Sequence, residues 1–462
     1  MKKFDLNIEK VLEDWGVHHA LREVIANALD EQALTNTKDI EILKEKAEKW
    51  HIRDFGRGLR QNHLTQNEDK EKQAHPDQVI GKFGVGLKDA FATFDRNKVK
   101  VIIKSKYCGI TLGKESKHGF ESITTLHALI DDSADSKFVG TEFVFEGIKD
   151  EDMNLAKEFF LKFSEEKLLE ATEYGQVLDK GKSKIARIYI TGLRVAEEEN
   201  FLFSYNITSV TKSIKKALNR ERTNVGRTAY AGRVKDILLE CREKRVAELL
   251  VDDLKKFEAG ELHDELDWID VSVHACKLLN ATEKVLFLTP SELFDAKEMV
   301  DRAKKDGYKI VTVPDNVKEK IHGLNDLEGK PIRDLSEYAS EWNKSFEFKF
   351  VKEKNLTKQE HEVFARTQAI LDLVGGKPKN VKEILISETM RTEAYSYQEA
   401  AGLWEPENNR IIIKRDQLKN LDGYAGVLLH EVAHARSNAK DISSEFEDEL
   451  TILLGKIAKK SL

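Results

Sequence analysis

The sequence predicts a multidomain protein of mixed class, with α/β and α+β parts. The first observation is its length, because 462 residues exceed what one hydrophobic core organises and about three domains are expected. The second is the alternation along the chain of short apolar runs, typical of strands, with longer segments of helical periodicity. The third is that only 6 prolines occur and no linker is rich in glycine and serine, so the domains should pack closely.

Residues 1–150 are predicted to form an α/β domain that binds a nucleotide. The segment Arg22–Asp30 (REVIANALD) places Glu23, Asn27 and Asp30 on one face of a helix and apolar residues on the other. A carboxylate, an amide and a second carboxylate along one line can supply a base and a metal ligand to a bound phosphate chain.

Two glycine-rich stretches follow this helix and offer backbone N–H groups to an anion. The first is Ile52–Gly58 (IRDFGRG), in which Asp54 precedes both glycines. The second is Ile80–Phe91 (IGKFGVGLKDAF). The glycines of the two stretches are Gly56, Gly58, Gly81, Gly84 and Gly86.

The order and wording of these three stretches resemble the GHKL ATPase superfamily, which includes gyrase B subunits, the ninety-kilodalton heat-shock chaperones, mismatch-repair ATPases and histidine kinases. Gly140–Thr141, which opens the apolar stretch GTEFVFEGI, looks like the fourth motif of that family. The resemblance spans residues 15–150 and implies a Bergerat-type α/β sandwich that binds ATP with Mg²⁺ and forms a homodimer.

The resemblance implies a role for each motif residue. Glu23 would orient and deprotonate the attacking water, and Asn27 would hold Mg²⁺. Asp54 would accept a hydrogen bond from the adenine amino group, with support from Thr141. A mobile lid and a helix N-terminus would surround the phosphates. The residues expected there are Gly81, Lys82, Gly84 and Gly86.

Some of these features have another interpretation. The polar stretch Gln61–Gln78 suits a lid that orders over bound nucleotide and equally suits a plain solvated loop. Taken singly, Glu23 is also compatible with a solvated helix charge, and Gly56 and Gly58 with ordinary turn glycines. Four motifs in family order favour the nucleotide site.

Residues 151–258 are expected to combine short strands with a long helical stretch, Thr211–Phe257. In GHKL proteins the domain after the nucleotide site is often a β/α transducer that inserts a basic side chain toward the γ-phosphate. Leu218–Arg222 (LNRER) is a candidate source, through Arg220 or Arg222, although a solvated charge run at a helix end is the favoured interpretation.

Residues 259–352 are expected to form a small α/β domain. Lys284–Leu288 (KVLFL) and Lys309–Val313 (KIVTV) predict short buried strands on either side of a helix over Glu292–Lys305. Parallel strands are the expected pairing of such a βαβ unit. The unit carries no glycine motif for phosphate, and no chemistry is assigned to it.

The last segment, residues 353–462, carries a second chemical motif. Val427–Ala435 (VLLHEVAHA) contains His430-Glu431-x-x-His434. On a helix this spacing places two imidazoles one turn apart, as ligands of a single Zn²⁺ require, and Glu431 would act as general base in peptide hydrolysis. A helix with two incidental histidines is the alternative.

The flanks of this motif resemble compact zincin metallopeptidases, which implies a mostly helical zincin-like domain. Asn409–Lys414 (NRIIIK) predicts a strand, and in zincins an edge strand in that place lines the substrate cleft. Asp441–Leu450 (DISSEFEDEL) would return a third ligand on a second helix, as in glutamate zincins. Glu447 also has the capping-box spacing from Ser444, an alternative that stays open. The candidate third ligands, in order of preference, are Glu447, Asp441 and Glu445.

Composition indicates the setting. The net charge of −7 argues against a protein that coats nucleic acid, although a local basic patch stays possible. The 3 cysteines form no CxxC pair, which fits a reducing compartment. The N-terminus has no apolar signal region, and no run approaches the about 18 apolar residues of a membrane span, so we expect a cytoplasmic protein.

Together the two motifs predict an ATP-regulated zinc metallopeptidase, in which a GHKL ATPase module gates a C-terminal HExxH peptidase that cleaves a protein or peptide. Such a two-enzyme chain suits stress control or phage defence. The alternative is an ATP-driven conformational switch, chaperone-like or acting on DNA, whose HExxH region is structural or inactive. A histidine kinase is poorly supported, because the residues before Glu23 leave no room for phosphoacceptor helices.

Overall fold

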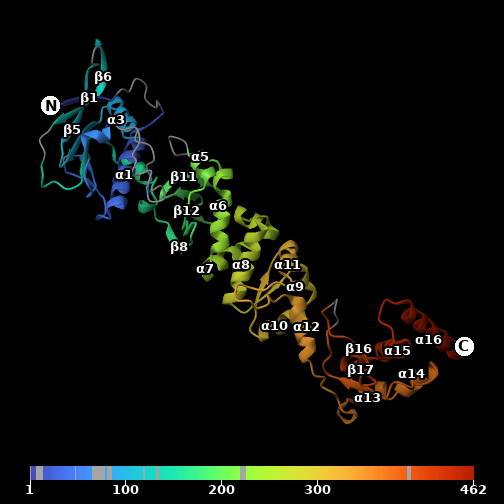
Figure 1. Cartoon of the computed structure of the whole chain (residues 1–462). Coiled ribbons are helices and arrows are strands. Elements are labelled where there is room, and N and C mark those ends of the chain that lie inside the picture. The colour runs from blue at the N-terminus through green and yellow to red at the C-terminus, as the bar shows by residue number, and fades with distance from the viewer. Residues whose placement is uncertain are drawn as a thin grey trace. The chain divides into compact units, whose positions relative to one another are not determined.

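The computed structural model describes residues 2–6, 14–46, 48–64, 79–80, 86–117, 120–131, 135–218, 225–392 and 397–461. The chain divides into two compact units, Met1–Leu278 and Leu279–Leu462. Figure 1 labels helices and strands of both units. Both units mix helices with sheets, which confirms the coarse α/β multidomain class. Within the described residues, no helix has the length and apolar content that crossing a bilayer requires.

The first unit opens with a seven-stranded sheet in the order β1-β6-β5-β4-β7-β3-β2, and every pairing in it is antiparallel. Its strands are β1 (Lys2–Asp5), β2 (Glu41–Lys44), β3 (Lys49–Arg53), β4 (Lys100–Ser105), β5 (Gly109–Lys117), β6 (Phe120–Asp131) and β7 (Thr141–Glu146).

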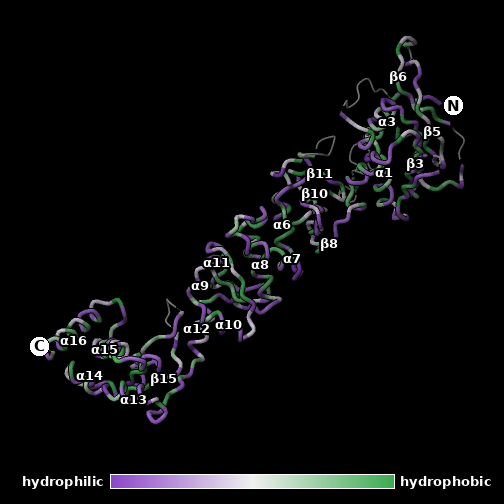
Figure 2. The backbone as a smooth tube through the Cα atoms, turned by 180° about the vertical axis from the view of Figure 1, so that it is seen from behind, coloured by the Kyte–Doolittle hydropathy of each residue, from purple (hydrophilic) through white to green (hydrophobic). Residues whose placement is uncertain are grey.

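Helices α1 (Val17–Thr35) and α3 (Gly86–Arg96) pack on this sheet. The other helical elements of this part are α4 (Asp150–Lys157) and the short 3₁₀ turns η1 (Gln61–Leu64) and η2 (Leu161–Phe163). Their apolar faces share one core with the strands. That core includes Leu21, Val24, Ile25, Phe91, Phe94, Ile52, Ile103 and Phe145. Figure 2 shows the alternation of hydrophobic and hydrophilic residues along these elements.

A five-stranded sheet follows in the order β11-β10-β12-β9-β8, with one parallel pairing, between β10 and β12. Its strands are β8 (Lys167–Ala171), β9 (Gly175–Asp179), β10 (Ala186–Ile190), β11 (Leu193–Glu198) and β12 (Ser204–Ile207). The later helices are α5 (Lys212–Ala217), α6 (Arg227–Glu240), α7 (Lys244–Leu254) and α8 (Ile269–Thr282), with 3₁₀ turns η3 (Phe257–Ala259) and η4 (Asp264–Asp267).

In the described residues, the helical stretch expected over Thr211–Phe257 is divided into the three helices α5, α6 and α7. One break has a clear cause. Glu170 of β8 accepts hydrogen bonds from the backbone N–H groups of Arg242 and Glu243, at 2.5 and 3.0 Å. A carboxylate at that position satisfies donors at a new helix start, so the chain turns after α6 and begins α7.

The second unit begins with the parallel pair β13 (Val285–Leu288) and β14 (Lys309–Thr312), which confirms the predicted βαβ pairing. The expected single helix between them is two helices, which meet at Ala296. The helices of this β13–β14 segment are α9 (Pro290–Asp295), α10 (Lys297–Lys305), α11 (Asp315–Ile321) and α12 (Leu335–Ser345).

The rest of the second unit is a three-stranded sheet in the order β15-β17-β16, packed against helices. The strands are β15 (Glu383–Ser387), β16 (Gly402–Glu405) and β17 (Arg410–Lys414); β17 is parallel to β15 and antiparallel to β16. The helices are α13 (Lys358–Phe364), α14 (Thr367–Leu373), α15 (Leu421–Ser437) and α16 (Ser444–Ser461), with 3₁₀ turns η5 (Glu353–Asn355) and η6 (Arg415–Lys419).

Candidate metal centre and nucleotide site

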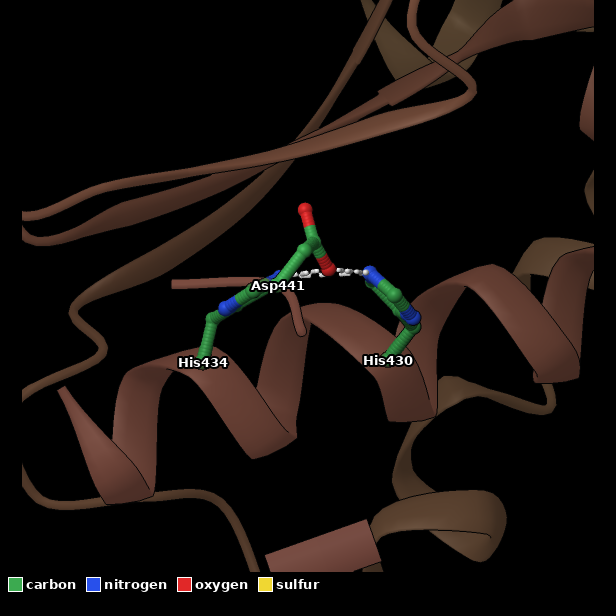
Figure 3. A group of neighbouring side chains, drawn as sticks. All are labelled: His430, His434 and Asp441. Carbon is green, nitrogen blue, oxygen red and sulfur yellow. Dashed lines mark hydrogen bonds and ion pairs between the residues drawn. The ribbon is translucent and has the colours of Figure 1, made fainter. Parts of the chain in front are cut away.

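Helix α15 presents the two histidines of the HExxH motif. Asn420 caps its start by accepting a hydrogen bond from the Gly423 N–H at 2.7 Å, and Asn438 ends it in the left-handed conformation, with φ of 54°. His430 and His434 lie one turn apart on the same face (Figure 3). The ring of Phe446 on α16 packs against both imidazoles, with centroid distances of 4.8 and 4.2 Å.

Three donor atoms meet above this face of the helix. The Nε2 atoms of His430 and His434 are 3.1 Å apart, and Oδ1 of Asp441 is 3.1 Å from each of them (Figure 3). Ligands of a tetrahedral Zn²⁺ with bonds near 2.0–2.1 Å are separated by about 3.3 Å. The triangle formed by the two histidines and Asp441 is thus close to one face of a zinc tetrahedron.

The hydrogen bonding of His434 also favours the tautomer that binds a metal through Nε2. Its Nδ1 lies 2.9 Å from the carbonyl oxygen of Ala439, so in the neutral ring Nδ1–H donates to that carbonyl. The proton is then on Nδ1, and the lone pair of Nε2 points toward Asp441 and His430. A backbone carbonyl commonly fixes the tautomer of a zinc-binding histidine in this way.

Asp441 takes the position for which Glu447 was the first choice. Within the described residues, the group with metal-binding geometry comprises His430, His434 and Asp441. Because Phe446 turns inward to the histidines, the next residue along α16, Glu447, is exposed on another face, as is Glu445. The alternative interpretation of Glu447 as a helix-start residue holds, because Glu447 lies in the first turn of α16. The capping residue is Ser443 rather than Ser444, since Ser443 accepts the Phe446 N–H at 3.3 Å.

The strand beside the motif is β16 rather than β17. The predicted strand over Asn409–Lys414 is confirmed as β17, but β17 is the middle strand of the sheet and β16 is the edge strand. Gly402 at the start of β16 lies against Glu431, because a Cβ at Gly402 would be 2.8 Å from Oε1 of that carboxylate. Glu431 is buried, with 6% of its surface exposed.

In the first unit, the structure brings Asp54 and Thr141 together at the end of paired strands β3 and β7. Asp54 Oδ1 accepts the backbone N–H of Gly56 at 2.9 Å and that of Thr141 at 3.3 Å. Thr141 Oγ1 in turn accepts the N–H of Leu59 at 3.0 Å. Burial raises the pKa of Asp54 to about 6.

Glycines allow the backbone to close around Asp54. Gly140 has φ of +81°, and a Cβ there would be 2.0 Å from the carbonyl oxygen of Asp54. Gly58 has φ of +87° and lies against Gly140. A Cβ at Gly56 would be 2.4 Å from the side chain of Glu31 on α1. The second and fourth motifs are therefore packed against each other and against α1.

The polar face of α1 meets the third motif. A Cβ at Gly86 would be 2.2 Å from Oε2 of Glu23, and Asp30 Oδ1 accepts the Ile80 N–H at 2.5 Å. Asn27 lies one turn after Glu23 and is partly buried. Oε1 of Glu23 also accepts from the guanidinium of Arg22 at 2.9 Å, in a pair that is almost fully buried.

Arg22 and Gly402 are site residues that sequence reasoning missed. Nothing in the local pattern marks Arg22, since its neighbours around the guanidinium, Trp15 and Phe159, are distant from each other in sequence.

Several expected residues lie outside the described part of the chain. These are Gly81, Lys82, Gly84, Arg220, Arg222 and residues 65–78 of the expected lid.

Comparison with known proteins identifies relatives in one organism. The family described as "Mycoplasma pneumoniae MPN635 N-terminal domain" matches residues 151–244. An "Uncharacterized protein" of Mycoplasma pneumoniae (strain ATCC 29342 / M129 / Subtype 1) is 36% identical over 247 residues, which cover 52% of this chain and 97% of that protein. The chain belongs to the family of that Mycoplasma protein.

A second "Uncharacterized protein" of the same strain is 25% identical over 345 residues, 70% of this chain and 96% of its own length. Neither relative's title states an activity. Membership of this family therefore does not indicate which reaction, if any, the chain catalyses.

Proposed function

We propose that this chain is an ATP-regulated zinc metallopeptidase, with a GHKL-type nucleotide site in the first unit and a zincin-like peptidase site in the second. The observation that carries the peptidase proposal is the triangle of His430, His434 and Asp441, with mutual donor distances of 3.1 Å. Two neutral nitrogen donors and one carboxylate are a donor set that Zn²⁺ favours.

In the peptidase reaction, His430, His434 and Asp441 would hold the metal. When bound, Zn²⁺ supplies a Lewis acid that polarises the scissile carbonyl. Glu431 is adjacent to the first ligand and would accept the proton of the attacking water at its carboxylate, then pass it to the departing amine. Its burial beside Gly402 limits its movement, which favours a fixed base over a solvated charge.

The nucleotide proposal is supported by how the first unit joins its motifs. The Thr141 N–H donates a hydrogen bond to Asp54, and Glu23 and Asp30 contact the third motif from α1. Asp54 would accept a hydrogen bond from the adenine amino group. Asn27 would hold Mg²⁺ on the phosphates, and Glu23 would take the proton of the attacking water. Dimerisation and a cytoplasmic setting belong to the same proposal. The buried cysteines Cys108, Cys241 and Cys276 form no disulfide, which fits a reducing compartment.

Metal analysis combined with an ATPase assay tests both sites on the same samples. Wild type should hold one zinc ion per chain, and His430→Ala should lose it while retaining ATP turnover. His361→Ala is the matched control, because His361 is exposed on α13 and pairs with Glu353. ATP turnover by a chain that binds no zinc would contradict the peptidase and favour a nucleotide-driven switch with an inactive HExxH region.

A further inference from the structure

A short arm links the β13–β14 segment to the strand beside Glu431. The arm consists of residues 390–392 and 397–401, which lie side by side. Thr392 pairs with Glu399 across the arm, and the Ala400 N–H donates to the Arg391 carbonyl at 2.9 Å. The arm leads into β16 at Gly402, so its position bears directly on that strand.

One end of the arm is bound to the β13–β14 segment. Tyr397 packs on the apolar core of that segment and directs its hydroxyl to Glu292 of α9 at 3.4 Å. Asn343 of α12 donates to the Thr392 carbonyl at 3.0 Å and accepts the Thr392 N–H at 3.0 Å. The contacts combine apolar burial with paired hydrogen bonds, so the arm is docked rather than merely adjacent.

Glu399 provides the charged part of this docking. Its side chain is 7% exposed and forms ion pairs with Arg302 of α10 and with Lys414 of β17, the latter at 2.9 Å. Arg302 lies over the ring of Trp342 at 4.6 Å, which restricts its direction. A carboxylate this buried needs its cations, because removing one leaves a poorly compensated charge. Glu399 thus ties α10 to the middle strand of the sheet.

Three residues after Glu399, at Gly402, the other end of the arm lies against helix α15, which carries Glu431. At Gly402 the backbone leaves no room for a side chain, since a Cβ would be 2.5 Å from Val427 and 2.8 Å from Oε1 of Glu431. The edge strand β16 is paired on one side, with β17. A displacement of the residues before Gly402 would therefore change the space available to the Glu431 carboxylate.

We propose that Arg302 and Glu399 are positioning residues for Glu431, and that the β13–β14 segment controls the peptidase site through them. This inference rests on the proposed peptidase function. Their ion pair holds β16 against the carboxylate of the general base. Because Glu431 acts in the transition state, loosening β16 should lower kcat far more than it raises KM. A misplacement of about 1 Å can cost about a hundredfold in rate.

The test uses the zinc-loaded full chain and fluorescein-labelled casein as the probe. Arg302→Leu should lower kcat by about tenfold with KM and zinc content unchanged and the chain still folded at the assay temperature, and should speed hydrogen exchange of the β16 amides. Arg302→Lys keeps the charge and should restore most of the rate. Lys304→Leu is the matched control, since Lys304 is on the same helix with an exposed side chain that pairs with Asp301.

A double variant separates the proposed route from a general effect of Arg302. If Arg302 acts through Glu399, adding Arg302→Leu to a Glu399→Gln chain should change kcat no further. Additive losses in the double variant would contradict that route.

Three other results would overturn the inference. One is unchanged exchange of the β16 amides in Arg302→Leu; another is faster exchange without a change in kcat; the third is a fall in kcat that accompanies zinc loss. If zinc-loaded wild type leaves casein intact, the proposed function fails on that probe. The exchange measurement then still decides whether the ion pair holds β16.

Discussion

The Nε2 atoms of His430 and His434 lie 3.1 Å apart, and Nδ1 of His434 lies 2.9 Å from the carbonyl oxygen of Ala439. Two imidazoles on consecutive turns of a helix reach this separation because residues four apart are neighbours on its surface. The carboxylate of Asp441 completes the triangle from outside the helix. This arrangement leads to the first of five predictions.

Asp441→Asn should weaken zinc binding by more than the about 10–100-fold that follows loss of an outer partner of a ligand, because the amide oxygen carries no charge. Glu447→Gln is the matched control on α16 and should leave zinc affinity unchanged. Competition with a chromophoric chelator measures both. A larger loss in Glu447→Gln than in Asp441→Asn would restore the glutamate as third ligand.

Nucleotide affinity should depend on pH through Asp54. Burial raises its pKa from 3.8 to about 6, and the ionised carboxylate accepts a stronger hydrogen bond from the adenine amino group than the protonated carboxyl does. ADP affinity should therefore fall below pH 6, by at most about tenfold per pH unit. Calorimetric titrations between about pH 5 and 8 test this, and Asp54→Asn should bind weakly with no such dependence beyond that of the phosphates themselves.

The same group should affect stability in the opposite sense. Because the pKa of Asp54 is higher in the folded chain than the ordinary 3.8, the native state binds more protons between pH 3.8 and about 6. The raised pKa of Asp54 makes its full favourable contribution to the free energy of unfolding below pH 3.8. This contribution is lost as the pH rises through about 6. Urea unfolding of wild type and Asp54→Asn across this range measures the difference.

Gly140→Ala should strongly destabilise the first unit and abolish ADP binding. Its φ of +81° already disfavours alanine by about 1–3 kcal/mol, and the new Cβ would lie 2.0 Å from the Asp54 carbonyl oxygen. Gly181→Ala is the matched control, with φ of +58° and no atom near its Cβ position. Thermal unfolding should show a small shift for Gly181→Ala and a much larger one for Gly140→Ala; equal shifts would mean that the close contact is easily relieved.

The two proposed bases should be separable. Glu23→Ala should abolish ATP turnover while ADP still binds, because the carboxylate acts on the water and not on the adenine. Glu431→Gln should abolish casein cleavage while zinc and ATP turnover remain. Parallel ATPase, binding and proteolysis assays provide the measurement. Loss of ATP turnover alone in Glu431→Gln would contradict this division of roles.

Local patterns predicted those features that depend on neighbouring residues. Helical periodicity was sufficient for His430 and His434, and short apolar runs were sufficient for β13, β14 and β17. Asp441 could not be chosen over Glu447, because the choice depends on the turn between α15 and α16 and on the inward direction of Phe446.

Long-range contacts explain the other differences. The end of α6 depends on Glu170, a residue far away in sequence whose carboxylate binds the start of α7. The neighbour of Glu431 was missed because β16 has only four residues and its importance comes from packing at Gly402. By contrast, family resemblance alone led us to expect Asp54 and Thr141 in one site. In the structure, the register of β3 against β7 brings the two residues together.

The three donors of the triangle differ in how firmly the chain holds them. The backbone of α15 holds His430 and His434 one turn apart, whereas Asp441 lies in the connection between α15 and α16 with 64% of its side chain exposed. An ion would therefore enter and leave as this short connection rearranges, while His430 and His434 stay in position on α15 to bind the ion again. The residence time of the ion would then be set by residues 438–443 and not by the strength of the two imidazole contacts.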